Sequence, residues 1–465
     1  MSQPTTEPTT EPTTEPTTEP PTEDRSVSAT RVAVASAIGT TIEWYDFFIY
    51  GTAAALVFGR QFFSAADPVV GTLAAFATFA VGFIARPIGG VVMGHFGDKI
   101  GRKSMLVLSL MLMGGATFCI GLLPTYAQIG VWAPTLLVAL RFVQGIGLGG
   151  EWGGAVLMTV EHAPEQKRGL FGSFVALGIP AGVILSNLIF LVISTSSSNK
   201  TFASWGWRIP FLLSAILVIV GLIIRLKIAE SPVFAQAQRA HTERKLPVLD
   251  VLRDHGGRVA LAAGSYLTTS ALGYVVIVYF VSYSTSVLHL PRNLVLALLL
   301  PATALQAASV IVFARWSDRL GRRRVLIWGS VAMLIWSAVF FALVDTKNIW
   351  LVAIALLVMM PLHGMYLGPQ PAMFSELFPT TVRYSGASLA IQIGTVLGGG
   401  VVPFVATALY RSYRSSVPIT IYLVVLCVIS LVCVIAIRET YHENLAKETA
   451  GRRATRASGP ATATR

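Results

Sequence analysis

Five ionisable residues lie inside long apolar stretches in the first half of the chain. They are Glu43, Asp46, Arg86, Arg141 and Glu151. Charges are costly in apolar surroundings, so residues of this kind are candidates for function before any others. A carboxylate there can take up and release a proton, and the planar fork of an arginine binds a carboxylate through two hydrogen bonds. The set therefore predicts a site that handles protons together with an anionic molecule.

The balance of charges suggests which of these residues bind protons and which bind the anionic molecule. Three acids face two arginines, so one carboxylate lacks a full cationic partner, and a buried carboxylate of that kind readily holds a proton. We expect the acids Glu43, Asp46 and Glu151 to couple to protons, with Glu43 or Asp46 as the carrier. Arg86 and Arg141 are then the residues that bind a carboxylate. The alternative is a closed salt-bridge network that only locks helices together.

Helical spacing brings some of these groups together. Gly39, Glu43, Asp46 and Tyr50 are separated by four, three and four residues, so they share one face of a helix. Two carboxylates on one face, one turn apart, can both reach the same neighbouring helices. Tyr50 continues that face, and we add it to the candidate binding residues.

The second half of the chain offers polar groups at its apolar centres instead of ionisable ones. These groups are Tyr266, Thr269, Tyr274, Gln306, His363, Tyr366, Gln370 and Gln392. We take Tyr266, His363 and Gln392 as candidate contacts to a bound molecule. His363 lies in a stretch broken by two prolines, and broken helices can line cavities inside a membrane. An isolated histidine is equally well explained as a packing residue.

The amino-acid composition indicates that all these residues lie in a membrane protein. Of 465 residues, 54% are hydrophobic and 12% are charged, about half the charged share of a soluble domain. This predicts a membrane protein. The net charge of +12 is explained by basic loops between apolar runs and does not indicate nucleic-acid binding. The cysteines Cys119, Cys427 and Cys433 have no metal-ligand spacing.

The apolar runs predict an all-α membrane protein with twelve transmembrane helices, since each crossing needs about 20 apolar residues. The predicted spans are 32–58, 70–93, 104–123, 136–160, 169–195, 208–229, 259–286, 293–314, 325–344, 349–374, 384–409 and 416–437. Twelve spans place both termini on one side. Most of the 35 lysines and arginines fall in segments on that side, which predicts cytoplasmic termini.

Motifs repeat between the two halves. The loop after the second span carries Asp98 and Arg102, and the loop after the eighth carries Asp318 and Arg322 at the same spacing. The pattern Glu-x-x-Pro-x-x-x-Arg follows the fourth and tenth spans, with the pairs Glu161 and Arg168, and Glu376 and Arg383. Such duplication predicts two pseudo-symmetric six-helix halves. We expect these eight residues to form a conformational latch; turns that only fix the topology are the alternative.

The order of these features predicts five regions. Residues 1–30 contain a repeated Pro-Thr-Thr-Glu unit and should form a disordered Thr/Glu/Pro-rich tail. The N-terminal six-helix half covers 31–229, a cytoplasmic linker covers 230–258, and the C-terminal half covers 259–438. Residues 439–465 should form a second cytoplasmic tail.

The loop Gly94–Lys103 resembles the signature loop of the major facilitator superfamily, although the second copy has Ala314 in place of its first glycine. The stretch Arg141-x-x-x-Gly145-x-x-x-Gly149 resembles the fourth-span motif linked there to proton coupling, and its glycines let another helix approach closely. Further stretches resemble the metabolite:H⁺ symporter family within it. They are Thr41–Phe48, Ala85–Gly90, Gly149–Gly154, Ser204–Phe211 and Glu230–Phe234.

The resemblance covers roughly residues 31–440 and implies a proton-coupled symporter of the inner membrane. Members of that family carry shikimate, 2-oxoglutarate, citrate, or proline and betaine. The two arginines favour uptake of a small organic acid; uptake of a zwitterionic osmolyte, an efflux antiporter and a non-transporting sensor remain open. We expect a monomer in the lipid bilayer whose partners are a small-molecule solute and H⁺. The sequence contains no Walker loop, and we expect no enzymatic activity, cofactor or metal.

Overall fold

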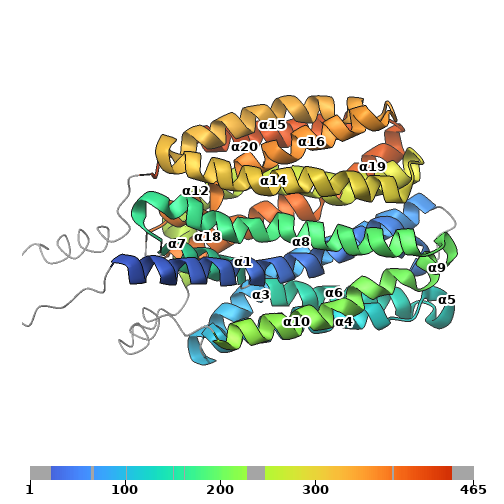
Figure 1. Ribbon diagram of the computed structural model, residues 1–465, viewed down its shortest axis with the longest axis horizontal. Helices are drawn as coiled ribbons and strands as arrows, with labels where there is room; N and C mark the ends of the chain where they lie inside the picture. The colour runs from blue at the N-terminus through green and yellow to red at the C-terminus, as the bar shows by residue number, and fades with distance from the viewer. Residues whose placement is uncertain are drawn as a thin grey trace, which may run out of the picture.

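The computed structural model describes residues 22–63, 68–100, 102–149, 151–161, 163–227, 247–379 and 382–441 (Figure 1). These residues form helices, and none of them belongs to a strand. The predicted tails and linker therefore lie largely outside the described part of the chain, but residues 22–30 of the predicted N-terminal tail already belong to the first helix. Residues 247–258 of the predicted linker are helical, because α12 begins at Pro247. This helix bends at His255, where the backbone leaves the helical conformation.

The first half contains six spans. They are α1 (Thr22–Ala53) with its π-helical continuation η1 (Ala54–Phe58) and α2 (Gly59–Gln61); α3 (Pro68–Ile100); α4 (Arg102–Leu122); α6 (Trp132–Leu148) with α7 (Glu151–Glu161); α8 (Arg168–Ser196); and α10 (Ile209–Lys227). Short helices connect them: α5 (Tyr126–Ile129), η2 (Glu165–Lys167), α9 (Asn199–Ser204) and η3 (Gly206–Arg208).

The second half repeats this plan. Its spans are α12 (Pro247–Tyr274) continued by η4 (Val275–Tyr279), α13 (Phe280–Ser282) and η5 (Tyr283–Val287); α14 (Arg292–Leu320); α15 (Arg322–Val344); α16 (Ile349–Leu367) with α17 (Gln370–Leu377); α18 (Arg383–Thr395) with η6 (Val396–Gly400) and α19 (Val402–Tyr413); and α20 (Val417–Ala436). The predicted twelve-helix architecture in two halves is confirmed.

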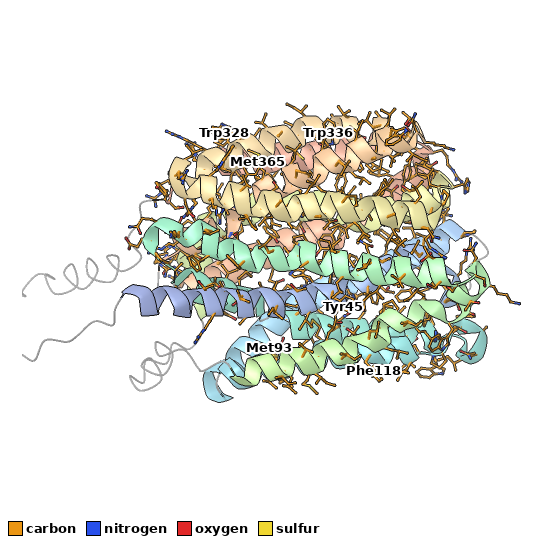
Figure 2. All side chains as sticks on the ribbon, viewed as in Figure 1. Tyr45, Met93, Phe118, Trp328, Trp336 and Met365 are labelled. Carbon is orange, nitrogen blue, oxygen red and sulfur yellow. The ribbon has the colours of Figure 1, made fainter. Side chains whose placement is uncertain are left out.

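The helices run side by side along the long axis of the molecule, with α8 of the first half next to α14 of the second (Figure 1). The helix α1 begins, and the described chain ends, at the same end of the bundle. Apolar side chains project outward along its length (Figure 2). On α20, for example, Ile421, Val428 and Ile435 are exposed. An apolar outer surface of this kind suits contact with lipid.

Two of the spans are each divided into two helices. The fourth is divided between α6 and α7 after Gly149, and the tenth between α16 and α17. A Cβ atom at Gly149 would clash with the carbonyl oxygen of Arg86, and one at Gly145 with that of Gly82. These glycines therefore let α6 pack directly on the backbone of α3, which carries Arg86 to the centre of the molecule.

Candidate functional site

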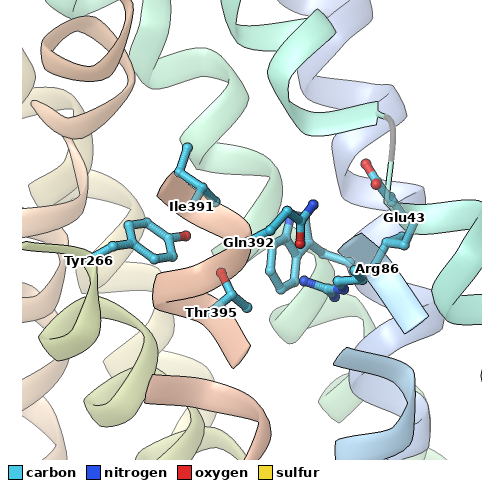
Figure 3. A pocket seen from close by; sticks show the side chains of 8 residues that line it. Glu43, Arg86, Tyr266, Ile391, Gln392 and Thr395 are labelled. Carbon is cyan, nitrogen blue, oxygen red and sulfur yellow. The ribbon is translucent and has the colours of Figure 1, made fainter. Parts of the chain in front are cut away.

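A narrow cavity with a volume of about 20 Å³ lies between the two halves (Figure 3). Its lining comes from α1, α3 and α6 of the first half and from α12 and α18 of the second. The lining residues are Glu43, Trp44, Arg86, Leu148, Tyr266, Ile391, Gln392 and Thr395. The structure thus brings together four of the residues that the sequence predicted, which are Glu43, Arg86, Tyr266 and Gln392.

Arg86 is the cationic group of this cavity. Its guanidinium carbon lies 4.5 Å from the ring centroid of Phe47 and 4.7 Å from that of Phe83. The side chain is buried, and neither Nε nor Nη2 has a hydrogen-bond partner. Aromatic faces attract the cation but cannot accept its N–H bonds with the strength of a carboxylate. Arg86 therefore holds unused donors for a ligand anion.

Arg141 lies outside the lining, behind the same aromatic cluster. Its guanidinium carbon is 4.1 Å from the ring centroid of Tyr50 and 4.4 Å from that of Phe47. It is fully buried; Nη1 donates to Gln144 Oε1 over 2.5 Å, while Nε and Nη2 have no partner. Phe47 thus contacts both arginines. The hydroxyl of Tyr50 is hydrogen-bonded to Thr78 over 2.6 Å, so Tyr50 contributes its ring to this cluster.

The two acids of α1 face different neighbours. Glu43 lines the cavity. Asp46 is completely buried and points toward α4, where a Cβ at Gly114 would lie 3.6 Å from its Oδ2. Neither carboxylate oxygen of Asp46 has a hydrogen-bond partner. The nearby Thr117 donates to the carbonyl of Met113 instead.

Gln144 connects the surroundings of Asp46 and Arg141. Its Nε2 donates to Thr117 Oγ1 over 2.8 Å and to the backbone oxygen of Asp46 over 3.4 Å, while its Oε1 accepts from Arg141. Gln144 therefore links Arg141 to the backbone of Asp46, while the carboxylate of Asp46 is not hydrogen-bonded to this network. The third acid, Glu151, is the first residue of α7, and its side chain lies outside the part that the structure describes.

His363 and Gln392 differ in their relation to the cavity. The ring nitrogens of His363 are hydrogen-bonded to Gln306 (2.7 Å) and to the carbonyl of Thr269 (2.8 Å). Both contacts lie inside the second half, so the structure does not bring His363 to the cavity and favours the packing interpretation. Gln392 does line it, and its Nε2 donates across the halves to the carbonyl of Gly149 over 3.2 Å.

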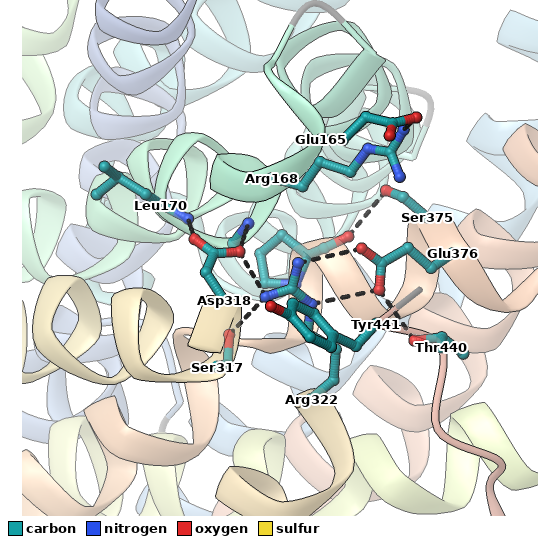
Figure 4. A network of polar contacts seen from close by, with 12 residues as sticks. Glu165, Arg168, Leu170, Ser317, Asp318, Arg322, Ser375, Glu376, Thr440 and Tyr441 are labelled. Carbon is teal, nitrogen blue, oxygen red and sulfur yellow. Dashed lines mark hydrogen bonds and ion pairs between the residues drawn. The ribbon is translucent and has the colours of Figure 1, made fainter. Parts of the chain in front are cut away.

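A network of charges joins the halves at the end of the bundle where α1 begins (Figure 4). Asp318 accepts hydrogen bonds from the backbone N–H groups of Gly169 (2.8 Å) and Leu170 (2.9 Å), which open α8 of the first half. Arg322 lies between two acids, 2.6 Å from Asp318 and 3.1 Å from Glu376. We call Asp318, Arg322 and Glu376 the latch, and the end they occupy the latch end.

The other predicted latch residues are placed less fully. Arg168 pairs with Glu165 over 3.3 Å, and Arg383 Nε donates to the carbonyl of Phe378 over 3.2 Å. The side chains of Asp98, Arg102 and Glu161 lie outside the described residues. The latch that the structure describes is therefore the second-half copy, together with the first turn of α8.

Sequence reasoning missed the aromatic groups that hold the arginines. Phe47, Phe79 and Phe83 pack on one another and on Tyr274, whose hydroxyl has no hydrogen-bond partner. Isolated phenylalanines in an apolar run carry no signal of such a cluster. Gln144 could have been found, because it follows Arg141 by three residues and so lies on the same helical face.

A family model described as Major Facilitator Superfamily matches this chain over residues 36–391 and 302–461. The chain belongs to the major facilitator superfamily. Its relatives in the superfamily include the inner membrane metabolite transport protein YhjE of Escherichia coli K12, 43% identical over 90% of this chain and 96% of that protein. The shikimate transporter of the same strain is 41% identical over 89% of this chain and 95% of its own length.

A proline/betaine transporter of Salmonella typhimurium is 34% identical over 89% of this chain and 84% of its own length. Among solved structures of the superfamily, the xylose transporter XylE of E. coli in a partially occluded inward open conformation aligns with a TM-score of 0.71. The identity there is 19%, over 90% of this chain and 99% of that one. This likeness supports the shared fold. The protein is thus a membrane transporter and not an enzyme.

Proposed function

We propose that this transporter takes up a small organic acid, such as shikimate or a dicarboxylate, together with protons. The observation that carries the proposal is Arg86, a buried guanidinium with two unpartnered N–H donors in a cavity that also contains Glu43. A buried cation whose donors are unused is a strong site for a carboxylate, because charge-assisted hydrogen bonds are about twice as strong as neutral ones. The 41% identity to a shikimate transporter supports the same class of solute.

Protons enter this proposal through the acids of α1. Asp46 is buried without a hydrogen-bond partner on either oxygen, and its neighbour Glu43 lines the solute cavity. A buried carboxylate without hydrogen bonds to stabilise its charge favours the protonated form. Asp46 or Glu43 therefore carries the proton, and Glu151 assists it. Arg141 is held near Asp46 by Gln144, which accepts from Arg141 and donates to the backbone oxygen of Asp46.

The latch controls access from one side in this scheme. The latch end faces the cytoplasm, with both termini there, because the basic loops lie on that side. The inner membrane is the compartment named for the YhjE relative. We also propose that the transporter acts as a monomer, since the two halves of one chain are enough to enclose the cavity.

A zwitterionic osmolyte is the second candidate. The proline/betaine relatives support it, and so does the cavity, where Glu43 and the ring of Trp44 stand beside Arg86. A carboxylate on Arg86 would leave the ammonium group of such a solute facing Glu43 or an aromatic ring.

Uptake into proteoliposomes under an imposed proton gradient separates the two candidates. The purified protein is tested with shikimate, dicarboxylates, aromatic acids, proline and betaine, and with Arg86→Ala as the control for the cavity. We expect accumulation of an organic acid that requires the gradient and is lost in the variant. Transport of betaine without transport of any organic acid would reverse the ranking.

A further inference from the structure

A groove separate from the central cavity lies at the latch end of the second half. It has a volume of about 100 Å³ and is formed by α12 just after its bend at His255 and by the ends of α17 and α20. Its lining residues are Arg258, Leu261, Leu377, Ala436, Ile437 and Arg438. The solute cavity and the latch use none of them.

Two guanidinium groups in this groove lack acidic partners. Arg258 donates through Nη1 to the carbonyl of Leu377 over 3.3 Å, and Arg438 is exposed. Among the described residues, neither arginine forms an ion pair. Asp254 lies one turn before Arg258, but its carboxylate is not within ion-pair distance of it.

The acid next to Arg438 is engaged elsewhere. Glu439 accepts hydrogen bonds from the backbone N–H groups of Arg322 (2.9 Å) and Arg323 (3.1 Å), which begin α15. It therefore caps that helix and does not neutralise the groove. The positive charge of Arg258 and Arg438 remains available to an outside anion.

The other walls of the groove are apolar and adjoin the lipid-facing surface. Leu261, Leu377 and Ile437 line it, and the neighbouring Val432 and Ile435 on α20 are 59% and 49% exposed. Arg438 lies just beyond the last residue of α20, Ala436, at the level where an apolar helix leaves the hydrocarbon. A ligand that fits here has a negative head and an apolar body.

We propose that this groove binds an anionic phospholipid, with Arg258 and Arg438 on its phosphate and the leucines and Ile437 against its glycerol and upper acyl chains. Basic pockets between helix ends bind acidic head groups in this way. A free phosphate would use the arginines and leave the apolar walls uncovered. The proposed lipid site and the positive charge of Arg258 and Arg438 do not depend on which solute the protein transports.

The groove lies directly beside the latch, so a lipid bound there can affect the latch. Leu377 directly follows the latch residue Glu376, and Arg438 directly precedes Glu439, which caps the helix that begins with Arg322. Thr440 also donates to Glu376 over 2.9 Å. A lipid that fixes Leu377 and Arg438 therefore stabilises the closed arrangement of the latch.

The test is thermal unfolding of the full-length protein in detergent, titrated with phosphatidylglycerol, phosphatidylcholine or inorganic phosphate. The altered protein carries Arg258→Gln and Arg438→Gln. Its matched control carries Arg315→Gln and Arg319→Gln, two exposed arginines of α14 that lose the same charge outside the groove. Each basic residue near an acidic lipid contributes about fivefold in affinity, so the loss of two should weaken phosphatidylglycerol binding roughly thirty-fold in the altered protein.

Phosphatidylglycerol should raise the unfolding temperature of the wild type and the control, and phosphatidylcholine and inorganic phosphate should not. An equal shift in the altered protein would overturn the site. A shift reproduced by inorganic phosphate would overturn the lipid assignment in favour of a simple anion site. No change in the unfolding temperature of the wild type with phosphatidylglycerol would overturn both the site and the lipid assignment.

Discussion

Asp318→Asn tests the latch, because Asp318 is the latch residue that bonds directly to the first half. Its Oδ1 accepts from the N–H of Gly169 and from Arg322, and its Oδ2 accepts from the N–H of Leu170. An asparagine amide oxygen can keep the Gly169 contact. Its NH₂ group would then face the N–H of Leu170, and two donors repel each other.

The size of the effect follows from the bonds that cross between the halves. The bond to Arg322 lies within the second half, so we count only the bonds from Asp318 to α8. Losing one charge-assisted hydrogen bond costs about 1.5–3 kcal/mol. Losing the negative charge at the start of α8 adds about 0.3–1 kcal/mol. The closed state is thus weakened by about 2–4 kcal/mol, and the open fraction rises roughly 30- to 700-fold.

The assay is the labelling rate of a cysteine behind the latch. Ser375 is fully buried on α17 and directly precedes the latch residue Glu376. The parent protein carries Ser375→Cys, with Cys119, Cys427 and Cys433 replaced by alanine. We expect N-ethylmaleimide to label it at least tens of times faster when Asp318→Asn is added.

The matched control is Asp345→Asn. Asp345 accepts from Tyr283 and Ser416, both in the second half, so the same chemical change there should leave the labelling rate as in the parent. Equal rates in the parent and in Asp318→Asn would refute the latch.

Three further changes address the cavity and its surroundings. Asp46→Asn should abolish accumulation driven by a pH gradient while leaving solute exchange intact, since exchange needs no net proton movement; gradient-driven accumulation in the variant would exclude Asp46 as the proton carrier. Arg86→Lys should raise KM about tenfold or more in uptake assays, because an ammonium cannot present two parallel donors to a carboxylate. Arg208 lies outside the cavity lining, so Arg208→Lys should leave KM unchanged. Equal KM values for Arg86→Lys and Arg208→Lys would count against Arg86 as the solute ligand. His363→Ala should lower the unfolding free energy by about 1–3 kcal/mol, because Gln306 and the Thr269 carbonyl lose a buried partner, with KM unchanged; an altered KM without loss of stability would restore His363 as a solute contact.

The spans could be predicted because each depends on the length of an apolar run, which is a local property. Among the described residues, nine helical segments are long and apolar enough to cross a membrane, and Val107–Leu122 and Trp132–Leu148 are shorter apolar helices. The second of these ends at the break before α7. The requirement for glycine at this break is a matter of packing, since a Cβ at Gly149 would clash with the backbone of α3.

The site was predictable as a set of residues but not as an arrangement. Helical spacing put Glu43 and Asp46 on one broad face, yet Glu43 lines the cavity and Asp46 faces α4. Residues three apart differ by about 60° around a helix, so the neighbouring helices decide which group each one meets. The partners of Asp318 were also hidden, because they are the backbone N–H groups of Gly169 and Leu170, which no side-chain pattern encodes.

The most direct test of proton coupling is the pH outside proteoliposomes when solute is added without an imposed gradient. If Asp46 or Glu43 carries a proton with each solute, the organic acid that the screen identifies should make the external medium more alkaline, and Asp46→Asn or Glu43→Gln should remove that signal. Solute uptake by the wild type with no change in external pH would contradict the account.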